Sequence, residues 1–177
     1  MTNEHPQTQT VPGVAAGYGD LLSECAEGPG VWIHVPARTI VVCVLLRDQP
    51  VRYDAHWVGG RVRPCPGATQ CALCTSGVGK KTRYVYTVLD TTTKQTGLLE
   101  VAPSTALEIR AAVDEAGFAR GLAIAFSHEG GVKNGRLRAT SRHQILRDCE
   151  LPDGPDPIHV LKRQWSLPDA ERVPSYR

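Results

Sequence analysis

Apolar and β-branched residues gather in several short stretches, which indicates a chain built mainly of strands. Residues 31–46 carry two such stretches, VWIHV and TIVVCVLL, and Pro36 between them predicts one interrupted strand or two short ones. Residues 56–62 and 82–90 predict the next two strands, and 97–101 predicts a further short one. Within 82–90 the alternation assigns one face to Tyr84, Tyr86 and Val88, and the other to Val85, Thr87 and Leu89.

The segment 103–116 has the different periodicity of a helix, with an apolar stripe formed by Ala106, Ile109, Val113 and Ala116. Thr105 and Glu108 have the spacing of a capping box, and Gly117 is suited to end the helix. Residues 121–126 and 136–142 then predict two strands, and the loop between them, HEGGVKNG, suits a hairpin.

With the short strand at 97–101 set aside, the order is three strands, a helix and two strands, with an insertion between the second and third strands. This is the order of an OB-fold, a five-stranded Greek-key barrel whose groove binds single-stranded nucleic acid. We therefore predict a mainly β, α+β architecture: an OB-fold-like five-stranded barrel with one helix and an insertion at residues 56–74. Other small α+β domains share such an order, so the order alone leaves them open.

The two ends of the chain lack this periodicity. Residues 1–30 mix Thr, Gln, Gly, Pro and Glu and are predicted to be a flexible N-terminal arm. The domain is expected to span residues 31–150, and residues 151–177 to form a C-terminal tail that is punctuated by prolines. We expect both ends to be dispensable for the core fold, although IHVL at 158–161 leaves a further edge strand open.

One histidine and three cysteines are concentrated in the insertion. His56, Cys65, Cys71 and Cys74 follow the spacing H-x8-C-x5-C-x2-C, in which the Cys-x-x-Cys turn brings two thiolates to one ion. These residues predict a closed tetrahedral site for a structural zinc ion, with no position left for water. Two alternatives remain: Cys43 or His34 takes the place of His56, or the cysteines are buried thiols without a metal. Cys25, Cys43 and Cys149 are expected to be free thiols.

Composition narrows the class of protein. The chain has 177 residues, contains no apolar run of membrane-spanning length and begins without the features of a signal peptide, so we expect a soluble, cytoplasmic protein. The formal net charge is only +2, but residues 47–94 hold eight Lys or Arg against three Asp. Such a local excess of positive charge attracts phosphates, although a solvated face of mixed charge is the simpler explanation.

Rings and cations near the insertion are candidates for nucleic-acid binding, because bases stack on flat rings and phosphates pair with cations. The candidate stacking residues are Trp57, Tyr84 and Tyr86. The candidate phosphate contacts are Arg61, Arg63, Lys80, Lys81 and Arg83, with a second row at Arg136, Arg138 and Arg142. The alternative for each ring is burial in the core, and for Arg136 and Arg138 a solvated strand face.

The succession of HW, CP, CALC, GKKTRY and YVYTVLD, followed by a helix, resembles the zinc-containing single-stranded-DNA-binding proteins of T-even-like bacteriophages. The similarity covers roughly residues 52–145. It implies an OB-fold, a zinc ion held by His56, Cys65, Cys71 and Cys74, and a role in DNA replication and recombination in a phage-infected bacterial cell. It also suggests self-association and replication or recombination proteins as partners. Because the first basic residue is Arg38 and the tail is nearly balanced in charge, cooperativity and tail-mediated recruitment are not carried over.

We therefore predict a sequence-nonspecific single-stranded-DNA-binding protein, with RNA left open as a ligand, and no enzymatic activity. A zinc nucleobase deaminase needs an H-x-E pair, whereas His56 is followed by Trp57 and Val58, and four protein ligands leave zinc no water to activate. The main alternative is a zinc-stapled protein-interaction module that binds no nucleic acid.

Overall fold

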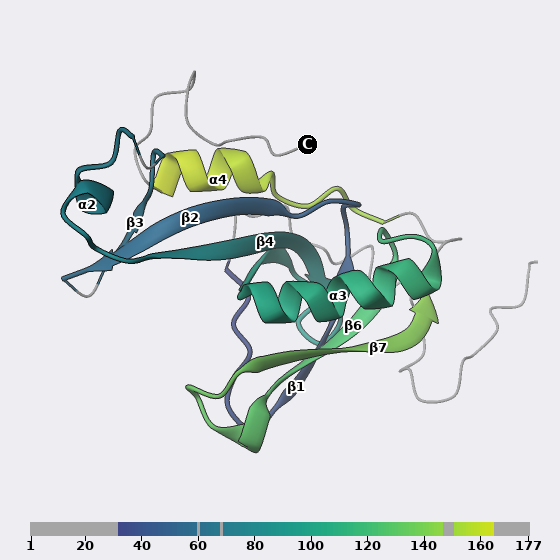
Figure 1. Ribbon diagram of the computed structural model, residues 1–177. Helices are drawn as coiled ribbons and strands as arrows, with labels where there is room; N and C mark the ends of the chain where they lie inside the picture. Colours follow the sequence, from purple (N-terminus) through teal and green to yellow (C-terminus); the bar gives the residue numbers. More distant parts are fainter. Residues whose placement is uncertain (1–31, 60, 68, 147–150, 165–177) are drawn as a thin grey trace, which may run out of the picture.

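Seven strands form one antiparallel sheet in the computed structural model, which describes residues 32–59, 61–67, 69–146 and 151–164 (Figure 1). The strands are β1 (Ile40–Leu45), β2 (Val51–Val58), β3 (Arg61–Pro64), β4 (Lys80–Asp90), β5 (Thr96–Val101), β6 (Leu122–His128) and β7 (Leu137–Ile145). The helices are α2 (Ala72–Thr75), α3 (Pro103–Ala116) and α4 (Pro157–Gln164), with a 3-10 turn, η1, at Glu129–Gly131. The protein is thus mainly β, as predicted.

Strand β4 is the axis of the sheet, whose order is β3-β2-β4-β1-β6-β7, with β5 paired to β4. Its first half pairs with β2, its last residues pair with β1, and its middle pairs with β5. Successive side chains of β4 point to opposite faces, as its alternation predicted. Within the described residues β5 and β7 do not pair, so the sheet is not closed into a barrel.

Helices α3 and α4 cover opposite faces of the sheet, which we call the α3 face and the α4 face. On the α3 face, the helix packs Ala106, Ile109 and Ala112 against strand residues that include Tyr86 and Phe126. On the α4 face, Leu161 packs with residues of β2, β4 and β5: Tyr53, Ala55, Val85 and Leu98. Successive side chains of a strand point to opposite faces of the sheet, so a residue and its next neighbour in a strand face different helices.

The predicted strand at 56–62 is wrong. A tight reversal at Gly59, whose φ is +57°, divides this segment between β2 and β3, which pair as a hairpin. A glycine tolerates this left-handed backbone at no steric cost. The predicted five-stranded barrel has too few strands, because β3 from the insertion and the short strand β5 both belong to the sheet.

Helix α3 occupies the predicted residues, and Gly117 ends it with a φ of 77° and an N–H bond to the Val113 carbonyl. The predicted capping box is not formed, since the N-cap is Ala102. Instead, the Thr105 hydroxyl donates to the Leu137 carbonyl, and a Glu108 carboxylate oxygen accepts the Ala139 N–H at 2.8 Å. These two side chains of α3 satisfy outward-facing backbone groups of β7.

The C-terminal segment contributes to the core. Residues 158–161 belong to α4 and not to an edge strand, and Leu161 is fully buried. Before α4, the Thr87 hydroxyl donates to the Pro155 carbonyl at 3.2 Å. The packed structure therefore continues to at least Leu161, whereas the predicted arm at 1–30, Cys25, Cys149 and the last part of the tail lie outside the described residues. None of the described helices is long and apolar enough to cross a membrane.

Candidate metal centre

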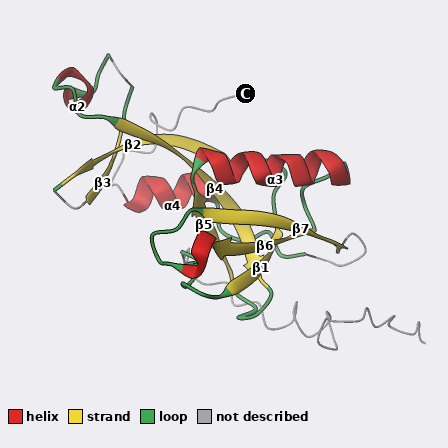
Figure 2. Cartoon of the chain, turned by 60° about the horizontal axis from the view of Figure 1, so that its bottom comes forward, coloured by secondary structure: helices red, strands yellow, loops and turns green. Residues whose placement is uncertain are grey.

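The end of β2, strand β3 and helix α2 lie at one end of the molecule, away from α3, in both views (Figures 1 and 2). We call residues 56–79 the metal hairpin. The Cys65 N–H bonds to the Asp54 carbonyl at 2.8 Å and so continues the β2–β3 ladder by one residue. Strand β4 then begins beside β2, with Lys80 opposite His56. Both ends of the loop between β3 and β4 therefore lie close to the part of β2 that carries His56.

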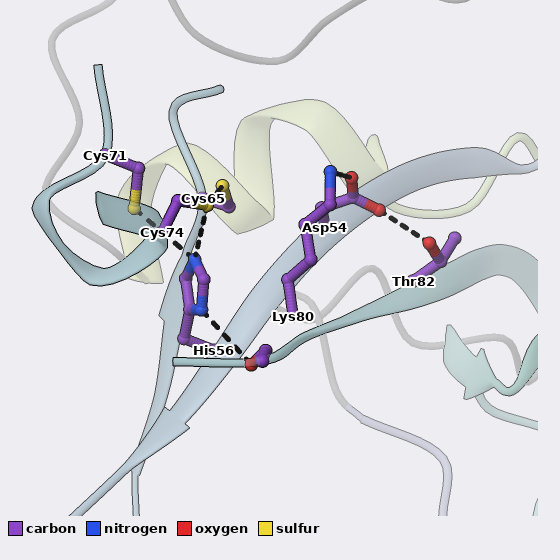
Figure 3. Close-up of polar contacts among 8 residues, drawn as sticks. Asp54, His56, Cys65, Cys71, Cys74, Lys80 and Thr82 are labelled. Carbon is purple, nitrogen blue, oxygen red and sulfur yellow. Dashed lines mark hydrogen bonds and ion pairs between the residues drawn. The ribbon is translucent and has the colours of Figure 1, made fainter. Parts of the chain in front are cut away.

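Four side chains converge inside the metal hairpin (Figure 3). The His56 Nε2 atom lies 3.3 Å from the Cys71 Sγ and 3.4 Å from the Cys74 Sγ, and the Cys65 Sγ lies 3.5 Å from the Cys74 Sγ. All four donor atoms lie within 4.8 Å of one another. The structure therefore brings together the complete ligand set predicted from the sequence.

Three of the six separations between donor atoms are close to those around a single tetrahedral ion. Ligands at ~2.0 to 2.3 Å from a tetrahedral zinc stand about 3.5 to 3.8 Å apart, close to the observed values of 3.3 to 3.5 Å. His56 and Cys71 are buried, while Cys65 and Cys74 are half-buried. One imidazole and three thiolates form a donor set that suits zinc and other soft or borderline metals.

A second hydrogen bond orients the imidazole. His56 Nδ1 lies 3.2 Å from the Gly79 carbonyl oxygen. A carbonyl oxygen only accepts, so this contact suits the tautomer with its hydrogen on Nδ1, in which the Nε2 lone pair would be available to a metal ion. Such a partner on the far nitrogen is typical of metal-bound histidines, because it selects the tautomer and holds the ring.

The thiols of the Cys-x-x-Cys turn differ in acidity. Backbone N–H groups, first that of Cys74 and then that of Leu73, stabilise the Cys71 thiolate and lower its pKa to about 7. Burial, followed by hydrogen bonding with the neighbouring thiols Cys65 and Cys71, raises the pKa of Cys74 to about 11. A cation in the centre would offset the repulsion between the thiolates, which is the normal reason that metal binding releases protons.

The alternatives for the fourth ligand are excluded by position. Cys43 lies in β1 within the core on the α3 face, where burial raises its thiol pKa. His34 is exposed beside β5 and lines a cavity on the α4 face. Neither belongs to the cluster of four, so His56 completes the site.

The predicted nucleic-acid residues do not form one groove, because they are divided between the two faces. By register, Trp57, Lys81 and Arg83 lie on the α4 face. Arg63, Lys80, Tyr84 and Tyr86 lie on the α3 face, together with the metal ligands. Arg61 belongs to β3 opposite Val58. The alternation of the strands therefore separates the predicted stacking residue Trp57 from Tyr84 and Tyr86.

The two predicted β4 tyrosines are not exposed platforms. Tyr86 is only 7% exposed and belongs to the core, where burial raises its pKa to about 12, and Tyr84 is half-buried against the same core. Both line a cavity of about 490 Å³ between α3 and residues 47–50. Tyr86 is thus a core residue, and its predicted role as a stacking residue is wrong. Trp57, at 63% exposure, is the ring that presents itself to solvent.

Several of the predicted phosphate contacts already have acidic partners. Lys80 Nζ lies 2.8 Å from Asp54 Oδ2, as Figure 3 shows, and Arg83 Nε lies 3.1 Å from Glu100 Oε1. Arg136 and Arg138 both pair with Glu108 on α3, at 2.7 and 2.8 Å. Among ion pairs between described residues, none involves Arg63, Lys81 or Arg142, which are exposed.

A second cavity, of about 350 Å³, lies on the α4 face and was missed from the sequence. It is lined by Trp32, Ile33, His34, Tyr53, Val62, Glu100 and Leu161. Its residues come from five separate segments, and the stretch VWIHV indicated only a strand. The one available signal was the presence of a Trp and a His two positions apart in that stretch.

Comparison of the chain with protein-family models, curated protein sequences and solved structures gives no match.

Proposed function

We propose that this chain binds single-stranded nucleic acid, DNA in the first instance, without catalysis, and that the metal hairpin supplies the main contact surface. The observation that supports the proposal is Trp57. This large ring is 63% exposed on a hairpin that the metal centre holds, and it stands directly opposite Val62, which is also exposed. An exposed apolar ring on a rigid support is suited to stacking, which contributes ~1 to 3 kcal/mol per base.

Cations flank this ring on both sides of the hairpin. Lys81 lies on the same face as Trp57. Arg63 lies on the opposite face but belongs to the edge strand β3, so a nucleic-acid strand stacked on Trp57 would reach it by passing around that edge. Both side chains are exposed, and neither takes part in an ion pair between described residues. A phosphate can bind these two cations without first breaking an ion pair between described residues. Lys80 and Arg83 are weaker candidates, because Asp54 and Glu100 already neutralise them.

The metal in this proposal is a structural zinc ion. Four protein ligands leave no open coordination position, so the ion would supply folding free energy and not an activated water. Its ligands connect β2, the loop after β3 and α2. The centre would therefore hold Trp57 and Arg63 in fixed positions relative to β4.

The connectivity supports an OB-like arrangement as part of the proposal. If β2 and β3 are set aside, the order is β1, β4, β5, α3, β6 and β7, with β4 and β6 both paired to β1. OB-folds are partly open and bind oligonucleotides across their second and third strands and the loop between the first and second. In this assignment β4 and β5 are those strands, and the metal hairpin lies in that loop.

The test is a titration of the metal-loaded full chain into a fluorescein-labelled dT15 strand, followed by anisotropy at several salt concentrations. We expect the logarithm of affinity to fall with the logarithm of salt, by ~0.7 for each phosphate contact on a single strand. Trp57→Ala should weaken binding about tenfold or more without changing this slope. Lys81→Ala and Arg63→Ala should each reduce the slope by about 0.7.

The matched controls are Leu107→Ala, which removes an exposed apolar residue from α3, and Lys133→Ala, which removes an exposed cation from the β6–β7 loop. Neither lies in the metal hairpin, so both should bind as the parent does. If Trp57→Ala retains its metal and binds dT15 like the parent, the hairpin is not the contact surface. If no strand binds at any salt concentration, the exposed Trp57–Val62 pair favours the second candidate function, a zinc-stapled protein-interaction module.

A further inference from the structure

The 350 Å³ cavity on the α4 face adjoins the proposed contact surface. Val62 lines the cavity and is also the cross-strand neighbour of Trp57. Tyr53, another lining residue, is on the same strand and face as Trp57, four positions away. One surface thus runs from the exposed ring into the cavity, over about 13 Å along β2.

The far wall of the cavity is held in place by backbone pairing. Trp32 forms a parallel bridge with Leu98 of β5, and the Ile33 N–H donates to the Leu98 carbonyl at 2.8 Å. Ile33 is buried in the core on the α3 face. Its neighbours Trp32 and His34 line the cavity and offer two flat ring systems opposite β2.

Glu100 is the carboxylate among the residues that line the cavity. Its Oε1 atom lies 3.1 Å from Arg83 Nε, and its Oε2 atom accepts the hydroxyl of Tyr53. A carboxylate has about four lone-pair sites, so each oxygen can accept a further hydrogen bond. Since an ionised carboxylate only accepts, a ligand in this cavity is recognised through N–H groups that it donates.

We infer that the cavity holds one base of the bound strand and prefers guanine, an inference that rests on the proposed function. The Watson–Crick edge of guanine carries two adjacent donors, N1–H and the N2 amino group, which match the two oxygens of Glu100. Thymine offers a single N–H between two carbonyl oxygens, which a carboxylate repels. Rings of Trp32 and His34 supply stacking surfaces, as in other sites that take unstacked bases.

The experiment compares three fluorescein-labelled 15-mers of dT that differ at the central position: dT, dG or deoxyinosine, which lacks the N2 amino group. We expect the guanine strand to bind about tenfold more tightly than all-dT, because a good bidentate contact discriminates by roughly that factor or more. The inosine strand should fall between them. Equal affinity for all three strands would overturn the guanine pocket while leaving strand binding intact.

Glu100→Gln tests the named residue, because it preserves the size of the side chain but replaces one acceptor with a donor. The ratio of guanine to thymine affinity should fall to near one in this variant. Glu129→Gln is the matched control, since Glu129 is an exposed carboxylate that pairs with Arg138 outside the cavity, and it should keep the ratio of the parent. A guanine preference that persists in Glu100→Gln would refute the inference, and so would the absence of binding to any strand, which would refute the proposed function as well.

Discussion

Removal of the metal should unfold the metal hairpin and leave the rest of the sheet intact. None of the three core clusters includes a residue between 56 and 79, although His56 and Cys71 are buried. A two-stranded hairpin without its own core is marginally stable at best. A metal ion bound to His56, Cys65, Cys71 and Cys74 would therefore supply nearly all of the local stability, and chelation should act there alone.

The magnitude follows from comparing two free energies. Structural zinc contributes ~10 to 16 kcal/mol in small peptides, which matches or exceeds the ~5 to 15 kcal/mol that stabilises a whole domain. With metal bound, the hairpin should thus open only when the domain unfolds. Without metal the hairpin should open at almost no cost, so it should lose at least the ~5 kcal/mol at the lower end of the domain's stability. Its amides should then exchange at least about 10³ to 10⁴ times faster.

Hydrogen exchange measured by mass spectrometry, with and without a chelator, provides the assay. Peptides covering β3 and α2 should lose protection, while those covering β6 and α3 should keep it. Cys71→Ser should reproduce the effect of the chelator, and Cys43→Ala, a change in the core away from the centre, should retain one metal ion per chain. Protection of β3 that survives complete removal of the metal would refute this account, as would equal loss of protection in β6.

Three further changes test the packing of the sheet. Leu161→Ala should lower the free energy of unfolding by about 2 to 5 kcal/mol, whereas Ile158→Ala, on the exposed side of α4, should change it by less than about 1 kcal/mol in urea denaturation. Glu108→Ala should cost ~1 to 3 kcal/mol, because it leaves the Ala139 N–H without its acceptor and removes the carboxylate that pairs with Arg136 and Arg138. Wild-type stability in thermal denaturation would exclude this role. Gly154→Ala places a Cβ 2.7 Å from Thr87 Cγ2, at a residue whose φ is +66°. The free energy of unfolding should therefore fall by ~1 to 3 kcal/mol. An unchanged denaturation midpoint would show that the segment before α4 does not pack against Thr87.

Features determined by neighbours in the sequence were predictable. The boundaries of α3 follow from its apolar stripe and from Gly117, and the alternation of β4 correctly separates Tyr86 from Val85. The four candidate metal ligands lie within nineteen residues, and their spacing predicted the set, although Cys43 and His34 stayed open as alternatives to His56.

Features that depend on pairing between distant segments were not predictable. Trp57 and Tyr84 both belong to strands near the metal hairpin, but only the register of β2 against β4 shows that they face opposite sides of the sheet. Thr105 and Glu108 have the spacing of a capping box, yet their partners lie about thirty residues away in β7. Local patterns record which residues alternate, and they carry no information about which strand lies alongside.

The contacts between α3 and β7 also bear on how copies of the chain meet. Open backbone groups on a terminal strand invite another sheet to extend the first, which is a common origin of aggregation. Here Thr105 and Glu108 occupy two of those groups on β7, and at the opposite end β3 is four residues long and includes Pro64, which has no N–H to offer. Several copies of the chain bound to one ligand would therefore not join their sheets through β3 or β7. Contacts between neighbouring copies would be made by side chains.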